Sequence, residues 1–299
     1  MTHMQTIEDT DIGGKHILVR ADFDVSADDA RIKENLPTIR SLVEKHNVVI
    51  ILAKRGRPTG KDPALSLKPI VDLLPRYMPD YTVTFISDHT SLTKTDFVYK
   101  PHHFYVLENL RFYEGEKDLD PAYVNQLASL GDIYVNDCFS MSHRSEASIT
   151  ELPKLLPAYA GLSLTKEIET LSHALGEPAK PYVVVMGGSK LETKLNLLQG
   201  LLGKADTILV GGVLANTFLK ASGFSVGASL YEKEYIKQKK NILDESKKTE
   251  TSILLPIDGD VGLQENSIAS STYSVDAIPE SGKIFDIGVK TQMLFAKKI

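Results

Sequence analysis

The chain has 299 residues, which is enough for one large domain or two ordinary ones. Its 42% hydrophobic and 24% charged residues are typical of a soluble globular protein, and neither a membrane-spanning run nor a secretory signal is evident. The formal net charge of −5 argues against a nucleic-acid partner, and one cysteine, Cys138, excludes an internal disulfide framework. We therefore expect a cytoplasmic protein that binds neither membranes nor nucleic acid.

Short β-branched segments recur along the chain and alternate with segments of helical apolar spacing. Continuous apolar strands in such an alternation are typical of parallel sheets that helices cover on both faces. The first series of predicted strands comprises residues 16–19, 48–52, 81–86, 104–107 and 132–135. The second series comprises residues 182–186, 207–210, 252–257 and, more weakly, 283–287.

The segment between the two series, residues 149–181, contains no strand candidate. Its second part is predicted to form a helix over residues 164–175, which Gly176 and Pro178 close. We interpret this segment as the connection between two α/β domains, with the boundary near residue 160.

The arginines are concentrated in the first half of the chain, because all eight lie at or before position 144. Arg57, Arg111 and Arg144 lie in loops that follow predicted strands, and Arg31 opens the helix after the first such loop. Ligands of open parallel sheets bind beyond the carboxyl ends of the strands, and the arginine fork matches carboxylate and phosphate oxygens. The pattern favours an anion-binding site over solvated surface residues.

The second series carries different chemistry. In "MGGSKLETK", Gly187 and Gly188 lie between a strand and a helix that presents Lys190 and Lys194 on one face. "VGGVLANTFLK" repeats the strand, glycine pair and helix. Exposed backbone N–H groups at a helix N-terminus suit phosphate oxygens. Neither segment has the spacing of a P-loop or of a dinucleotide-binding fingerprint.

Two other patterns give weaker evidence for a functional site. His143 and Glu146 are three residues apart, but no third metal ligand is evident, so we predict no metal site formed by the protein alone. No activating arrangement accompanies Cys138, and a small buried thiol is the better interpretation.

These segments resemble those of phosphoglycerate kinases along essentially the whole chain. Nine follow one another in the family's order: "RADFD", "RIKENLPTI", "GRP", "ENLRF", "GDIYVNDCFSMSHRSEAS", "GGSKLETK", "GGVLANTFLK", "LPID" and "DIGVKT". The resemblance implies an α/β fold with two doubly wound parallel-sheet (Rossmann-like) domains that face each other across a cleft. Residues 1–160 would form the phosphoglycerate-binding domain and residues 161–299 the nucleotide-binding domain.

Carried over by position, the resemblance implies two sets of site residues and a reaction. The substrate set is Asp22, Phe23, Asp24, Arg31, Lys54, Arg57, Arg111 and Arg144. The set for ADP or ATP with Mg²⁺ is Gly187, Gly188, Lys190, Lys194, Gly211, Gly212 and Pro256. Arg31 and Lys190 are the implied catalytic residues. The implied reaction of glycolysis transfers a phosphoryl group reversibly between 1,3-bisphosphoglycerate and ADP, giving 3-phosphoglycerate and ATP. A carboxylate acceptor is ionised at pH 7, so positioning and charge stabilisation suffice without a general base.

Three features depart from the family pattern. Asp24 stands where the family usually has Asn, and the loop from Asp24 to Arg31 is shorter. Lys54 and Arg55 replace the family's His and Leu, and Glu146 replaces a His. We interpret the basic residues gained at positions 54 and 55 and the acidic residues gained at positions 24 and 146 as reciprocal changes, each compensating the charge of the other. The chain also lacks the family's later Asn-Gly-Pro and Gly-Gly-Gly-Asp stretches, about a quarter of the usual length. We therefore expect the second domain to be incomplete, with helix faces and a sheet edge exposed.

The first interpretation is a phosphoglycerate kinase, by default a monomer. The alternative is a catalytically silent relative or fragment that retains only anion binding. A nicotinamide-dependent oxidoreductase on the same architecture lacks its glycine fingerprint. The sequence leaves open the nucleotide preference, the oligomeric state and whether the shortened chain turns over.

Overall fold

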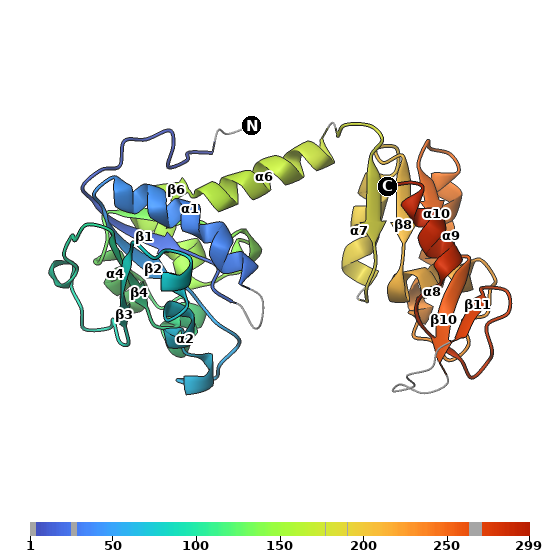
Figure 1. The fold of residues 1–299 in the computed structure, drawn as a ribbon, viewed down its shortest axis with the longest axis horizontal. Coiled ribbons are helices and arrows are strands. Elements are labelled where there is room, and N and C mark those ends of the chain that lie inside the picture. The colour runs from blue at the N-terminus through green and yellow to red at the C-terminus, as the bar shows by residue number, and fades with distance from the viewer. Residues whose placement is uncertain (1–3, 25–28, 177, 190, 263–270) are drawn as a thin grey trace. The chain divides into compact units, whose positions relative to one another are not determined.

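The structure is a computed structural model (Figure 1). It describes residues 4–24, 29–176, 178–189, 191–262 and 271–299, with the side chains of 191–193 outside the description. The chain divides into two compact units, Met1–Leu171 and Ser172–Ile299. The division falls within helix α6 (Leu162–Leu175), and the boundary expected near residue 160 lies just before this helix.

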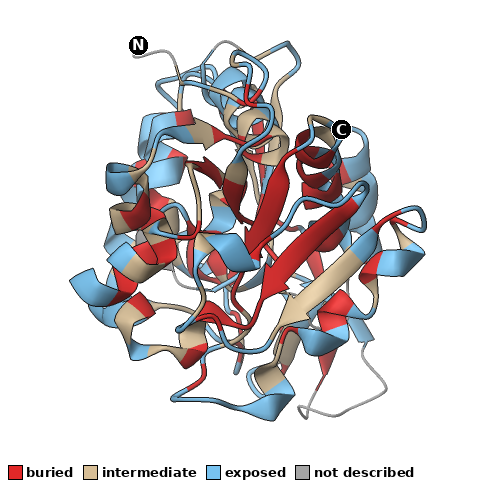
Figure 2. Ribbon diagram, turned by 90° about the vertical axis from the view of Figure 1, so that its left-hand side faces the viewer, coloured by how far each residue is buried: buried red, intermediate tan, exposed pale blue. Residues whose placement is uncertain are grey.

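The first unit is built on a six-stranded parallel sheet with the order β3-β4-β2-β1-β5-β6 (Figure 1). Its strands are β1 (His16–Arg20), β2 (Val48–Leu52), β3 (Thr82–Ile86), β4 (His103–Leu107), β5 (Ile133–Asn136) and β6 (Ala158–Ala160). Every residue of β2 and β4 is buried, which confirms the sheet predicted from continuous apolar runs (Figure 2).

Helices cover both faces of this sheet. They are α1 (Ala30–Glu44), α2 (Lys68–Val71), α3 (Glu114–Asp118), α4 (Pro121–Ala128) and α5 (Leu152–Leu155), together with α6. Successive residues of a strand point to opposite faces. Ile17 and Val19 accordingly lie in one apolar cluster, with residues of α1, and Leu18 lies in another, with residues of α4. Two clusters on one sheet confirm a doubly wound unit.

One part of the predicted connection is wrong. Residues 158–160 form β6, which pairs in parallel with β5, although residues 149–181 were expected to hold no strand. "AYA" has no β-branched residue, so its strand conformation depends on pairing with β5 rather than on propensity. The predicted helix after it is confirmed as α6, which begins two residues earlier than expected and ends as predicted.

The second unit contains a three-stranded parallel sheet in the order β7 (Val183–Met186), β8 (Thr207–Val210), β9 (Ser252–Leu254). Its helices are α7 (Leu191–Leu201), α8 (Gly212–Ala221), α9 (Ile236–Ser246) and α10 (Val289–Ala296). Leu198, Ile208 and Phe218 are fully buried in its core. Strand β7 lies at an edge of the sheet, where Val185 is 68% exposed.

The strand predicted at residues 283–287 exists as β12 (Lys283–Ile287), but it does not continue the parallel sheet. It pairs antiparallel with β10 (Asp258–Gly262), whose other neighbour is β11 (Ser271–Ser274). Both β11 and β12 flank β10 and run antiparallel to it. Parallel strands need a crossover connection, and the described chain between β9 and β12 forms β10 and β11 instead, so β12 does not join the parallel sheet. No helix in the described ranges has the length and apolar character that crossing a bilayer requires.

Candidate functional site

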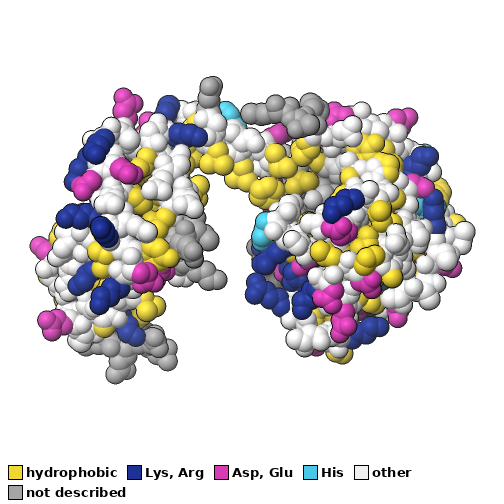
Figure 3. Space-filling model, turned by 180° about the vertical axis from the view of Figure 1, so that it is seen from behind, with side chains coloured by type: hydrophobic (Ala, Val, Ile, Leu, Met, Phe, Trp, Pro, Cys, Tyr) yellow, Lys and Arg dark blue, Asp and Glu magenta, His cyan; other side chains and the backbone are white. Residues whose placement is uncertain are grey.

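Loops from several strands meet at the carboxyl end of the first sheet. Because these strands are parallel, the loops after β1, β2, β4 and β5 leave the sheet at the same edge. They carry the predicted acidic and basic side chains. Figure 3 shows Lys and Arg side chains gathered beside Asp and Glu side chains on the surface of the first unit.

Asp24 joins the loops after β1 and β2. Its carboxylate pairs with the Lys54 ammonium and accepts the Gly56 N–H at 2.8 Å. Burial raises the pKa of Asp24, but the bonds from Gly56 and Lys54 outweigh it and lower this pKa. The reciprocal changes proposed at positions 24 and 54 therefore lie in direct contact, while their energetic coupling stays a prediction.

Arg31 lies on α1 beside the carboxylate of Asp22, with 3.4 Å between Arg31 Nη1 and Asp22 Oδ2. Ser140 donates its hydroxyl to the same Asp22 oxygen at 2.7 Å, and the Asp22 N–H donates to Asn35 Oδ1 at 2.5 Å. Sequence reasoning did not single out Ser140 or Asn35, although Asn35 lies inside the quoted segment "RIKENLPTI". They fix Asp22 from two other elements.

Arg111 does not extend freely into the site. Its Nη1 donates to the Gly56 carbonyl at 2.6 Å, and its Nε donates to Glu146 Oε1 at 3.1 Å, an oxygen that its Nη2 also contacts. Glu146 lies in addition 3.8 Å from Nη2 of Arg20, a fully buried arginine at the end of β1. The two arginines and Glu146 form a buried charged cluster, which we call the Arg20–Glu146–Arg111 triad.

A second carboxylate borders the triad. Glu116 is fully buried and accepts the hydroxyl of Ser148 at 2.6 Å and its N–H at 3.1 Å. Burial raises the pKa of Glu116 to about 7, against the lowering effect of Arg20. Glu116 therefore belongs to the buried surroundings of Arg20 rather than to the loops of the site.

The remaining predicted substrate residues are placed differently. Arg57 and Arg144 are exposed, and neither has a side-chain partner in the described part of the chain. The Phe23 side chain is fully buried in the apolar cluster that contains α1. Arg55 donates to the carbonyls of Ala64 and Ser66 at 3.2 and 3.0 Å, so it supports its own loop.

In the second unit, two glycine loops approach each other closely. Gly188 has φ of +97° and Gly212 has φ of +60°, and a Cβ on Gly212 would lie 3.0 Å from the Gly188 nitrogen. The Lys194 ammonium donates to the carbonyls of Gly187 and Ser189 at 2.5 and 3.0 Å. Glycine at these positions thus permits a backbone approach that other residues would hinder. Lys190 lies outside the described residues.

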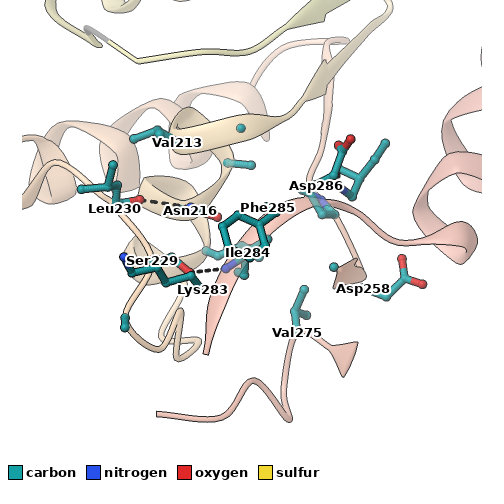
Figure 4. A pocket seen from close by; sticks show the side chains of 17 residues that line it. Val213, Asn216, Ser229, Leu230, Asp258, Val275, Lys283, Ile284, Phe285 and Asp286 are labelled. Carbon is teal, nitrogen blue, oxygen red and sulfur yellow. Dashed lines mark hydrogen bonds between the residues drawn. The ribbon is translucent and has the colours of Figure 1, made fainter. Parts of the chain in front are cut away.

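A cavity of 280 Å³ adjoins these loops at the start of α8 (Figure 4). Its lining includes the predicted residues Gly212 and Pro256, whereas Gly187, Gly188, Gly211 and Lys194 do not line it. Asn216 donates to the Leu230 carbonyl at 3.0 Å, and Ser229 accepts the Ile284 N–H at 2.8 Å. Most of the lining is apolar: Val213, Ala215, Leu219, Ala228, Leu230, Pro256, Val275, Ile284, Phe285 and Ile287. A mostly apolar cavity with a few placed polar groups suits a small organic ligand.

The described residues form no group of three or more His, Cys, Asp or Glu side chains that would hold a metal ion.

The comparisons with known proteins agree with these observations. The family model for phosphoglycerate kinase matches residues 7–299. The phosphoglycerate kinase of Bradyrhizobium diazoefficiens is 39% identical over 293 residues, which cover 95% of this chain and 73% of that protein. That of Sinorhizobium medicae is 41% identical over 300 residues, covering 96% and 74%.

Solved structures agree as well. The phosphoglycerate kinase of Coxiella burnetii matches with a TM-score of 0.82 and 33% identity, covering 99% of this chain and 77% of that one. The enzyme of Pyrococcus horikoshii matches with a TM-score of 0.83 and 27% identity, covering 98% and 78%. The match in sequence, in fold and in the order of the site loops shows that this chain belongs to the phosphoglycerate kinase family.

Proposed function

We propose that this chain catalyses the reversible transfer of a phosphoryl group between 1,3-bisphosphoglycerate and ADP, giving 3-phosphoglycerate and ATP. The observation that carries the proposal is the family match over residues 7–299, which includes both the basic loops and the glycine loops. We further propose that the chain acts as a monomer in the cytoplasm, where its buried Cys138 would remain a free thiol.

The first unit is the proposed phosphoglycerate site. 3-Phosphoglycerate carries a carboxylate and a phosphate, and Arg57 and Arg144 are exposed cations able to bind oxyanions with two parallel N–H donors. Arg31, exposed beside Asp22, is the proposed catalytic cation of this unit. Asp22, held by Ser140 and Asn35, would orient both Arg31 and the hydroxyl end of the substrate.

The second unit is the proposed nucleotide site. Its cavity suits the apolar faces of a base, and Gly212 and Pro256 in its wall place it next to the glycine loops. N–H groups at those loops, with Lys190 and Lys194, would bind the phosphates of ADP or ATP. Mg²⁺ would enter with the nucleotide as part of the substrate.

The proposed reaction does not require a side chain to act as a general base. The acceptor carboxylate is already ionised at neutral pH, so no group has to remove a proton. Arginine and lysine donors would stabilise the negative charge on the transferring oxygens and hold donor and acceptor in line. This division of labour agrees with a site whose charged side chains are cations and orienting carboxylates.

A coupled assay that starts from 3-phosphoglycerate and Mg-ATP tests the proposal. Arg57→Ala and Arg144→Ala should each raise KM for 3-phosphoglycerate about ten- to a hundredfold, the cost of losing a charge-assisted hydrogen bond. Arg76→Ala is the matched control, because Arg76 is an exposed arginine that precedes β3 at the other end of the sheet. Binding of both ligands to a folded wild type without any turnover would contradict the proposed activity.

A further inference from the structure

Glu146 occupies the donors with which Arg111 would bind an anion. The Nε and Nη2 groups of Arg111, one edge of its guanidinium, both contact Glu146 Oε1. The Nη1 group donates to the Gly56 carbonyl at 2.6 Å. A guanidinium binds a carboxylate or phosphate best through two parallel donors along one edge. Each edge of Arg111 therefore already has at least one partner within the protein.

A second arginine also favours this position of Glu146. Glu146 is 5% exposed, and its second carboxylate oxygen lies 3.8 Å from Nη2 of the buried Arg20. A carboxylate between two arginines in a buried setting has strong electrostatic reasons to stay there. It is part of the folded first unit rather than a mobile surface group.

The other cations of the predicted substrate set show the same pairing. Lys54 pairs with Asp24, and Arg31 lies 3.4 Å from Asp22. With Arg111 on Glu146, three of the five cations already have a carboxylate partner, whereas Arg57 and Arg144 have none among the residues that the structure describes. Of the three pairs, the Arg111 pair has the least exposed carboxylate, at 7% of its side chain.

We propose that Glu146 is an affinity-determining residue of the phosphoglycerate site, because its carboxylate competes with the anionic substrate for Arg111. This inference rests on the proposed function of the first unit. The substrate binds through the unpaired cations and reaches Arg111 only when it displaces Glu146. Removing the negative charge of Glu146 while keeping its shape therefore strengthens substrate binding.

A purely structural role predicts the opposite sign. If Glu146 served to hold Arg111 in a position that the substrate needs, its neutral analogue would leave Arg111 misplaced and would weaken binding. The direction of the change in affinity thus separates competition from support.

Calorimetric titration of the full chain with 3-phosphoglycerate and, separately, with ADP tests the proposal. Glu146→Gln should lower Kd for 3-phosphoglycerate about tenfold, as expected when the substrate forms one additional charge-assisted hydrogen bond. Its Kd for ADP should stay unchanged, because the nucleotide residues lie in the second unit. Glu116→Gln is the matched control, since Glu116 is an equally buried acid that bonds Ser148 and not Arg111. It should change the Kd for 3-phosphoglycerate less than about twofold.

The outcomes are distinguishable. Unchanged or weaker binding of 3-phosphoglycerate to Glu146→Gln overturns the competition while leaving the proposed function in place. Binding to neither the wild type nor the variant overturns the proposed function and the inference together. Circular dichroism checks that the variant is folded. If it is not, Glu146→Asp, which keeps the charge but withdraws it from Arg111, should tighten binding to a smaller extent, and failure to do so also overturns the inference.

Discussion

Lys239 is a fully buried lysine whose Nζ has no hydrogen-bond partner among the described residues. It lies on α9, and its ammonium sits 4.7 Å from the centre of the Phe218 ring in the core of the second unit. Burial lowers the pKa of Lys239 from 10.5 to about 8, with nearby Glu232 raising it and Lys194 lowering it further. We predict that Lys239→Met stabilises this unit at pH 7.

The magnitude follows from the difference between the folded and unfolded pKa. A fall from 10.5 to about 8 means that keeping Lys239 charged in the folded state costs about 3 kcal/mol. The cation–π contact with Phe218, about 0.5–2 kcal/mol, is lost in the variant, so a net stabilisation of about 1–3 kcal/mol is expected. Because the unfolded chain binds the extra proton between pH 8 and 10.5, wild-type stability should rise with pH over that window. The advantage of the variant should shrink correspondingly.

Urea unfolding of the full chain at pH 7 and pH 10, together with hydrogen exchange of α8 and α9 amides at pH 7, measures the effect. Lys240→Met is the matched control, because Lys240 is the exposed neighbour of Lys239 on the same helix. It should leave the free energy of unfolding within about 0.5 kcal/mol. A Lys239→Met protein that is less stable than wild type at pH 7, or whose advantage persists unchanged at pH 10, would refute the reasoning.

Three further predictions concern the Asp24–Lys54 pair, Asp258 and Gly212. Asp24→Asn and Lys54→Met should each destabilise the first unit, and a double-mutant cycle in urea should give a coupling energy above about 1 kcal/mol, whereas additive effects would rule out the reciprocal change. Asp258→Asn should cost about 1–3 kcal/mol of stability, because the buried Asp258 carboxylate accepts N–H groups at the start of α10. Despite burial these bonds lower the pKa of Asp258, so its contribution to stability is present at neutral pH and is lost as pH falls below 3.8, and the difference in unfolding free energy between wild type and variant should shrink over that range. Gly212→Ala should raise Kd for ADP severalfold and cost about 1 kcal/mol, since its φ is +60°. Gly200→Ala, in open space on α7, is the control and should not weaken ADP binding.

The sequence predicted the first unit well because its central strands, such as β2 and β4, are buried on both faces. A run such as "VVIIL" has few interpretations in a soluble protein, and it is the fully buried β2. The parts that pattern reasoning missed are those whose conformation depends on distant partners. Strand β6 has only three residues and forms against β5, and β11 is a polar, exposed segment that pairs with β10. Neither contains the continuous run of apolar β-branched residues by which the buried strands were predicted.

The site could be predicted as a neighbourhood but not as a set of contacts. The rule that loops at the carboxyl ends of parallel strands share one edge correctly grouped Asp24, Lys54 and Arg111. It could not show that Arg111 pairs with Glu146, 35 residues further along the chain, because the positions of cations in a sequence do not reveal which already have partners. The motif that contains Phe23 likewise could not show that its side chain is buried in the core.

The pair of Asp24 and Lys54 gives a physical reason why the two departures from the family pattern that we infer from the sequence would coexist. Lys54 is only 6% exposed, and a buried ammonium without a partner would cost several kcal/mol. Asp24 supplies that partner, and the Gly56 N–H satisfies its other oxygen at 2.8 Å. Either change alone would leave a charge without compensation, whereas together they add no net charge to the site. For the proposed phosphoglycerate site, we therefore expect the positive potential that attracts the substrate to come from Arg57 and Arg144, and we expect the Arg111–Glu146 pair to set the affinity in the way proposed above.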